Sequence, residues 1–67
     1  PPEVLLLTAR EREVCKLLAR GLTSKEAARL MGVAKTTVDN HRLHIAQKLR
    51  MDTHGLVAWS GAHREWL

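Results

Sequence analysis

The stretch LTSKEAARLMGVAKTTVDNHRLHIAQKLR, residues 22–50, decides the fold of this chain. Thr23 and Glu26 stand three positions apart ahead of an apolar run, which is the pattern of a capping box at a helix start. Gly32 follows that run and suits the left-handed backbone that ends many helices. A second, longer helix is expected over residues 35–50. The stretch therefore predicts two helices joined by a turn of three or four residues.

The longer helix has two chemically different faces. Val38, Ile45 and Leu49 recur at helical spacing and form an apolar stripe that should be buried. The opposite face, near the N-terminal half, carries Lys35, Thr36, Asp39, Asn40 and Leu43. A recognition helix has this arrangement, because its first side chains reach base edges while its back packs on a scaffold. The pattern indicates a helix-turn-helix DNA-binding domain.

The flanking segments predict two further helices. Thr8 and Glu11 repeat the capping-box spacing, and Gly21 closes the helix that follows. Ahead of that helix, residues 1–7 are expected to form a non-helical lead-in, because Pro1 and Pro2 oppose an early helix start, and residues 4–7 should pack on the domain.

After the longer helix, Asp52 or Thr53 should cap a short fourth helix. The fold class is therefore all-α, a small four-helix domain over residues 1–67 with a central helix-turn-helix. The helices are expected at about residues 9–20, 24–31, 35–50 and 54–62.

Composition limits the class of protein. The 67 residues contain no Phe or Tyr and two Trp, so the core must be mainly aliphatic. The single Cys15 excludes an intramolecular disulfide and fits a reducing, cytoplasmic compartment. No apolar run is long enough to span a bilayer, and no signal peptide is visible. The chain does not begin with Met, which suggests a domain cut from a longer regulator or a trimmed protein.

Charge favours a polyanionic partner only mildly. Eleven Lys and Arg against seven Asp and Glu give a net charge of +4, spread evenly along the chain. The sequence lacks a glycine-rich phosphate loop and a nucleophile–base arrangement, so an enzyme is not expected and no cofactor is implied. His41 and His44 stand three apart, but a closed zinc site needs about four ligands, so no metal is expected.

The chain resembles the LuxR/FixJ-type (GerE-like) DNA-binding domain of bacterial response regulators and quorum-sensing regulators. The resemblance covers roughly residues 5–60. The matching motifs are Leu7-Thr8-x-Arg10-Glu11-x-Glu13-Val14, Leu17-Leu18-Ala19-x-Gly21-Leu22, Lys25-Glu26-x-Ala28-x-Leu30, Thr37-Val38-x-x-His41 and Ile45-x-x-Lys48-Leu49. The usual Arg before the fourth helix appears as His54, or is lost if the preceding connection is one residue short.

The resemblance implies roles for individual residues. The third helix would lie in the major groove, with Lys35, Thr36, Asp39, Asn40 and Leu43 toward the bases. Thr23, Ser24, Thr37 and Lys48 match positions that touch phosphates, and Arg42 is a basic candidate for the same role. The fourth helix usually forms a dimer contact, here through Leu56, Val57 and Trp59.

The chemistry of three base-facing residues specifies possible partners. Asn40 can bond N6 and N7 of adenine together, Asp39 can accept from N4 of cytosine, and Leu43 can contact a thymine methyl. Asp39 and Leu43 depart from the basic residues common in the family.

Two other functions share this scaffold. One is a helical protein–protein interaction module that has lost DNA binding, which the acidic Asp39 and apolar Leu43 motivate. The other is a promoter-recognition module of sigma-factor type with RNA polymerase as its partner. Steep salt dependence of DNA affinity would separate DNA binding from an apolar protein interface.

Overall fold

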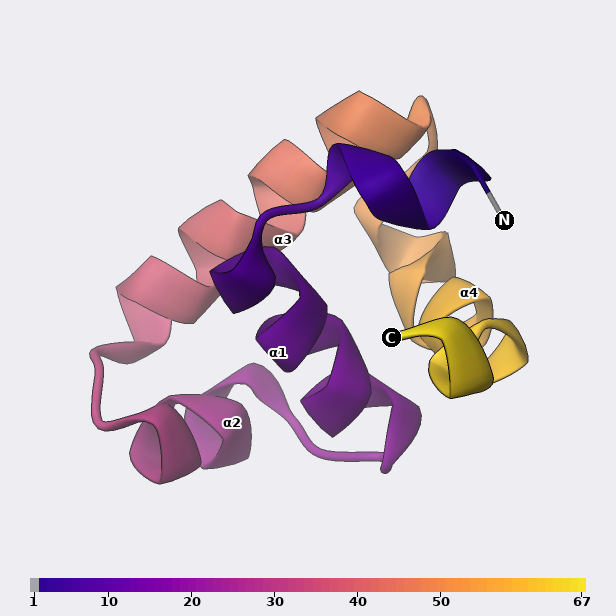
Figure 1. Cartoon of the computed structure of the whole chain (residues 1–67). Helices are drawn as coiled ribbons and strands as arrows, with labels where there is room; N and C mark the ends of the chain where they lie inside the picture. Colours follow the sequence, from indigo (N-terminus) through magenta and orange to yellow (C-terminus); the bar gives the residue numbers. More distant parts are fainter. Residues whose placement is uncertain (1) are drawn as a thin grey trace.

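The structure, a computed structural model, describes residues 2–67; the expectation for Pro1 falls outside this range. Within it the chain forms α-helices and short 3₁₀-helices and no strand, which confirms the all-α prediction. In chain order the elements are η1 (Pro2–Leu6), α1 (Ala9–Ala19), α2 (Ser24–Met31), α3 (Lys35–Leu49), η2 (Thr53–Gly55), α4 (Leu56–Ala62) and η3 (Arg64–Trp66). Helix α1 lies in the middle and contacts α2, α3 and α4, while α2 packs on α3 (Figure 1).

Both predicted capping boxes are present. The Thr8 hydroxyl accepts from the Glu11 N–H at 3.1 Å, and the Glu11 carboxylate accepts from the Thr8 N–H at 2.9 Å. Thr23 and Glu26 make the same pair of hydrogen bonds at the start of α2. Helix α2 closes at Gly32 with φ of 71°, a left-handed backbone that glycine adopts without steric cost.

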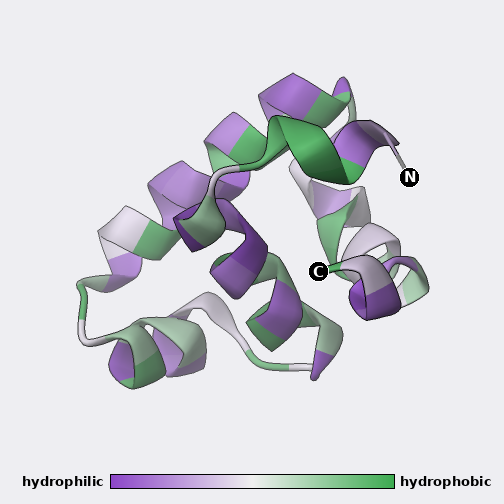
Figure 2. Ribbon diagram, viewed as in Figure 1, coloured by the Kyte–Doolittle hydropathy of each residue, from purple (hydrophilic) through white to green (hydrophobic). Residues whose placement is uncertain are grey.

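The core lies around α1, where α2, α3 and α4 pack, and all four helices contribute buried residues to it. Each helix alternates between apolar and polar residues along its length (Figure 2), so each can turn one face inward. The buried cluster is aliphatic, as the composition predicts: Leu7, Val14, Cys15, Leu18, Ala27, Ala28, Val38, Ile45 and Leu56. The Cys15 thiol is fully buried, which raises its pKa and makes it a packing residue.

The lead-in prediction is wrong in part. Residues 2–6 form the 3₁₀-helix η1, with Pro2 at its first position, where the fixed φ of proline favours a helical turn. Val4 and Leu7 are buried, but Leu5 and Leu6 point to solvent with 78% and 55% of their surface exposed. Three residues per turn place only one side of so short a helix against α3.

Three boundaries also differ from the predictions. Helix α1 ends at Ala19 rather than at residue 20. Helix α3 ends at Leu49, and Arg50 takes a left-handed conformation with φ of 54°. The fourth helix begins at Leu56 rather than 54, because Asp52 caps the 3₁₀-turn η2 by accepting from the His54 N–H. The tail folds back as η3.

Arg12 in α1 is half-buried, and its Nε is enclosed without a hydrogen-bond partner within residues 2–67.

One part-buried ion pair ties α1 to α3. The Lys48 ammonium donates to Glu11 Oε1 at 2.6 Å, and the Glu11 side chain is only 6% exposed. Burial raises the pKa of this carboxyl, but the hydrogen bonds from Lys48 and Thr8 outweigh it, and the net pKa is lowered. Glu11 therefore caps α1 and holds the C-terminal part of α3 at once.

We expect Glu11→Ala to lower the free energy of unfolding by about 1–3 kcal/mol, because it removes a helix cap and leaves the Lys48 charge unpaired. Urea unfolding measures the loss. Glu26→Ala is the matched control, since it removes the same capping box from an exposed site with no interhelix pair, and it should cost less. The lowered pKa means that the Glu11 contribution is complete above the ordinary carboxyl pKa and disappears as pH falls through the folded value. Equal losses for the two variants at neutral pH would contradict the role of the ion pair.

Candidate nucleic-acid interface

The N-terminal half of α3 presents its predicted polar face to solvent. Val38 and Ile45 on the other side are fully buried, so the rotation of the helix is fixed. The residues predicted to contact bases lie on the outward side: Lys35, Thr36, Asn40 and Leu43 are exposed and Asp39 is half-buried. Leu43 leaves 47% of its surface exposed, and Leu5, Leu6 and Leu30 are exposed to a greater degree.

A chain of polar contacts joins this face to the start of α2. Lys35 donates to Asp39 at 2.7 Å within α3, and Arg42 Nη1 donates to the Ser24 hydroxyl at 2.9 Å between helices. The hydrogen bond from Lys35 is the main cause that lowers the pKa of Asp39, and a hydrogen bond from Ser24 adds to it. The Lys35 ammonium thus favours the charged form of Asp39, and the bond from Arg42 to Ser24 joins α3 to the start of α2.

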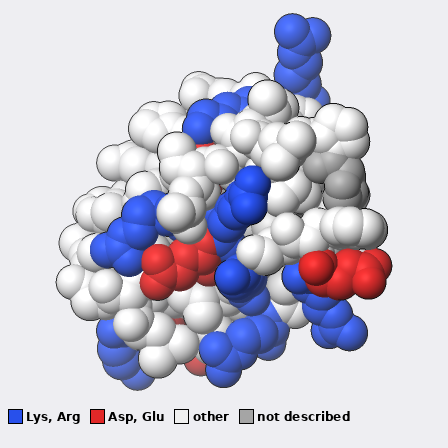
Figure 3. Space-filling view, viewed as in Figure 1, with Lys and Arg blue, Asp and Glu red and all other residues white. Residues whose placement is uncertain are grey.

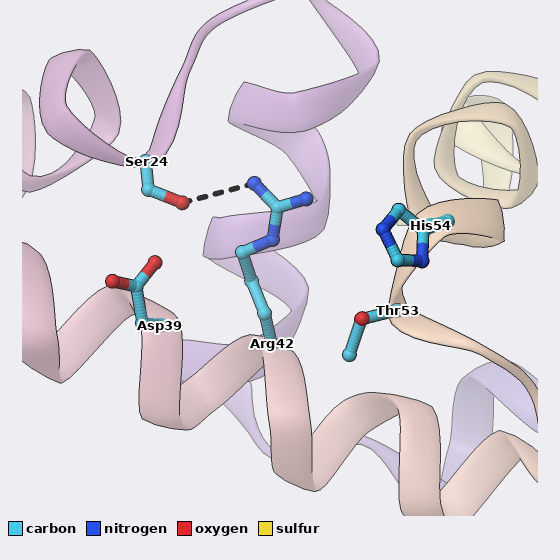
Figure 4. A pocket seen from close by; sticks show the side chains of 5 residues that line it. All are labelled: Ser24, Asp39, Arg42, Thr53 and His54. Atoms are coloured by element: carbon cyan, nitrogen blue, oxygen red, sulfur yellow. Dashed lines mark hydrogen bonds between the residues drawn. The ribbon is translucent and has the colours of Figure 1, made fainter.

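The same contacts border an open hollow between α2, α3 and η2. Ser24, Asp39, Arg42, Thr53 and His54 line it. Figure 4 shows the Arg42 side chain rising from α3 between Ser24 and Asp39 on one side and Thr53 and His54 on the other. Thr53 and His54 were not among the predicted DNA contacts. Only the packing of η2 against α3 brings them here, and no local motif signals that packing.

The remaining residues predicted to contact phosphates differ in their exposure and in the partners that they already have. Thr23 and Thr37 are exposed, although the Thr23 hydroxyl already accepts from the Glu26 N–H. Ser24 is buried, with 8% of its surface accessible. Lys48 is engaged by Glu11, so any phosphate contact would compete with that ion pair.

The predicted dimer residues do not lie together on the surface. Leu56 is fully buried in the core, which corrects its assignment to the dimer contact: a side chain packed inside the domain has no surface for a partner. Val57 is 43% exposed, and Trp59 is half-buried with its ring stacked on His63 at a centroid distance of 4.4 Å.

Charge is distributed over the surface in small groups. Figure 3 shows Lys and Arg scattered over one face, with acidic side chains between them, in agreement with the even spread along the sequence. Residues 2–67 bring no three His, Cys, Asp or Glu side chains together as metal ligands. None of the helices described is long and apolar enough to cross a membrane.

Helix α2, the Gly32 turn and the outward face of α3 define a helix-turn-helix domain. The family described as bacterial regulatory proteins of the luxR family matches residues 5–58. The chain belongs to this family, whose members include DNA-binding transcriptional regulators.

Several curated relatives match the same region. A response regulatory protein, YgeK, of Escherichia coli strain K12 is 46% identical over 48 residues, which are 72% of this chain and 31% of that protein. The nitrate/nitrite response regulator NarL of the same strain is 39% identical over 49 residues, or 73% of this chain and 23% of that protein. The oxygen regulatory protein NreC of Staphylococcus carnosus is 41% identical over 46 residues, or 69% and 21%. The chain thus spans less than a third of these relatives, and no solved structure matches it at a significant level.

We expect Asp39→Asn to raise the affinity for duplexes of any sequence by about threefold to tenfold at low salt, because it removes an anion that neutralises Lys35. Fluorescence anisotropy with a random-sequence duplex measures the change. Glu13→Gln removes an equivalent carboxylate, the partner of Arg10 on α1, and serves as the control for net charge. If both variants gain affinity equally, the Asp39 network has no local effect on DNA binding.

Proposed function

We propose that this domain binds double-stranded DNA in a sequence-specific manner, with α3 in the major groove, as part of a bacterial transcriptional regulator. The observation that carries the proposal is the asymmetry of α3. Its inner face is fully buried at Val38 and Ile45, while the first turns expose amide, hydroxyl, ammonium and apolar groups suited to base edges.

The individual contacts follow from side-chain chemistry. Asn40 reads adenine, Asp39 accepts from N4 of cytosine, and Leu43 packs on a thymine methyl. Lys35 and Thr36 complete the base-facing set. Phosphate contacts come from Thr23, Ser24, Thr37, Arg42 and Lys48, and they orient the domain without reading sequence.

The relatives support a regulatory setting. Two are named as response regulators, and the matched segment is under a third of each. We infer that this domain acts in the cytoplasm, receives its signal from another domain or a partner, and affects RNA polymerase at a promoter.

The test of sequence-specific binding is selection of bound duplexes from a random pool, followed by titration of the selected duplex. We expect a short motif to be enriched. Asn40→Ala should weaken binding to the selected duplex by about tenfold or more, and should change binding to a scrambled duplex much less, since an amide–adenine pair contributes about 1–3 kcal/mol of discrimination. Gln47→Ala is the matched control, because Gln47 is an exposed amide outside the base-facing set of the same helix.

The salt dependence of binding distinguishes the alternatives. Affinity should fall steeply as salt rises, since each phosphate contact releases counterions. Enrichment of no motif, with weak binding to any duplex, would contradict sequence-specific readout. No binding even at low salt would overturn DNA binding and favour the helical protein-interaction module, to which the exposed Leu43 would then contribute.

Dimer formation has its own test. We propose that α4 forms a symmetric contact through Val57, with Trp59 at its border, so a palindromic site should bind two copies. Val57→Glu should abolish the two-copy complex in sedimentation experiments on a palindromic duplex, while the one-copy complex persists. Leu5→Glu places the same charge on another exposed apolar side chain and should leave both complexes unchanged. Two-copy binding by the Val57 variant would exclude this surface.

A further inference from the structure

Two oppositely charged groups lie side by side on the outward face of α3. Lys35 and Asp39 are four positions apart and therefore lie on the same side of the helix. The Lys35 Nζ lies 2.7 Å from Asp39 Oδ2, and the two side chains keep 60% and 43% of their surface exposed. The first turns of α3 thus hold a hydrogen-bond donor beside an acceptor, open to a molecule outside the domain.

Helix stability does not account for this pair. An exposed ion pair contributes little to the free energy of unfolding, because water screens it. Lys35 is also the first residue of α3, where the positive end of the helix dipole disfavours a cation, and Ala34 before it makes no side-chain cap. The favourable order places the acidic residue four positions ahead of the basic one, and this pair has the reverse order. The arrangement is unfavourable for the helix, which favours a role in binding.

We propose that Lys35 and Asp39 act as one unit that reads a single G·C base pair in the major groove. The Lys35 ammonium donates to O6 and N7 of guanine, and the Asp39 carboxylate accepts from N4 of cytosine. The inference rests on the proposed DNA-binding function and deepens it, because it assigns both residues to the same base pair and fixes the orientation of that pair.

The major-groove edge of a G·C pair has the complementary arrangement of groups. Guanine O6 is an acceptor and cytosine N4 is a donor, and the hydrogen bond between them holds these atoms about 2.9 Å apart. The 2.7 Å between Nζ and Oδ2 matches that spacing, so one group can donate to O6 while the other accepts from N4. Guanine N7 is a second acceptor beside O6 for the ammonium, which has three donors.

Other base pairs fit this unit less well. In an A·T pair the central group, adenine N6, is a donor between two acceptors, adenine N7 and thymine O4. A carboxylate on N6 therefore lies beside acceptors that repel it, and the ammonium meets a single acceptor instead of the adjacent O6 and N7 of guanine. An inverted C·G pair presents the groups of G·C in the opposite order, whereas α3 holds the two side chains in one order.

The ion pair also allows a carboxylate to approach DNA. The phosphates would repel an isolated aspartate, but Lys35 and Asp39 together carry no net charge. The hydrogen bond from Lys35 is the main cause that lowers the pKa of Asp39, which favours the charged form of the carboxylate. A charged carboxylate can only accept hydrogen bonds, and the amino group of cytosine can only donate them.

The experiment measures the affinity of the 67-residue chain for the duplex selected from the random pool and for altered duplexes, in which each fixed G·C pair in turn is inverted to C·G or replaced by A·T. We expect one G·C pair whose alteration weakens binding by about tenfold or more. Lys35→Ala and Asp39→Ala should each remove most of this preference. The ratio of affinities is the readout, because it cancels general changes in phosphate attraction.

The double variant tests whether the two residues act as a unit. Lys35→Ala combined with Asp39→Ala should lose no more of the preference than either single variant, since either change breaks the unit. Arg10 and Glu13 provide the matched control, because they form an exposed ion pair at 2.9 Å on α1. Arg10→Ala and Glu13→Ala should leave the preference unchanged. Circular dichroism checks that the helices persist, as expected for alanine, which favours helix.

The outcomes separate this inference from the proposed function. A selected motif without an oriented G·C pair, or a preference that either single variant retains in full, would overturn the inference and leave sequence-specific binding intact. Effects of Lys35→Ala and Asp39→Ala that add, or that fall on two different base pairs, would overturn the joint reading as well. If selection enriched no motif at all, the proposed function itself would fail.

Discussion

The carboxylate of Glu11 joins helices α1 and α3. It accepts from the Thr8 N–H and completes the cap of α1, and it accepts from the Lys48 ammonium across 37 positions of sequence. A buried carboxylate without these donors would be costly, and a lysine near the end of α3 is favourable for the helix dipole. One oxygen, Glu11 Oε1, therefore accepts both hydrogen bonds. It fixes the crossing of α3 over α1 near the C-terminal end of α3.

That constraint divides α3 into two parts. Toward its C-terminal end, Ile45 and Leu49 pack on the core and Lys48 is paired, so this part serves as scaffold. Toward its start, the helix begins at Ala34 without a side-chain cap and exposes polar groups. Base readout requires side chains free to exchange water for a base edge on a rigidly held backbone. A helix anchored at one end and exposed at the other meets both needs.

The helices were predicted well because the signals that mark their starts involve residues close together in the sequence. Thr8 and Thr23 each precede a Glu by three residues, and this spacing alone places two helix starts. The left-handed turn at Arg50 carries no glycine signal, so the end of α3 was predicted one residue too late. The start of α4 was predicted too early because Asp52 caps the 3₁₀-turn η2 instead. Helical periodicity predicted which residues lie on the outward face of α3. The position of Thr53 beside Arg42 was not predicted from the sequence. The hollow between α2, α3 and η2 is made by contacts between distant segments, and neither residue spacing nor residue type predicts these contacts.

Under the proposed DNA-binding function, the acidic Asp39 on the outward face of α3 has a consequence for selectivity. Asp39 neutralises Lys35 at 2.7 Å, so the network offers less net attraction to an arbitrary phosphate backbone than its count of basic groups suggests. Non-specific affinity comes mainly from phosphate attraction, whereas discrimination comes from base edges. A lower non-specific affinity with unchanged base discrimination raises the ratio of specific to non-specific affinity. That ratio decides occupancy among many competing sites. A second copy on the same duplex, as in the proposed dimer, would offset this weak attraction, since linked binding multiplies modest affinities without any new base contact.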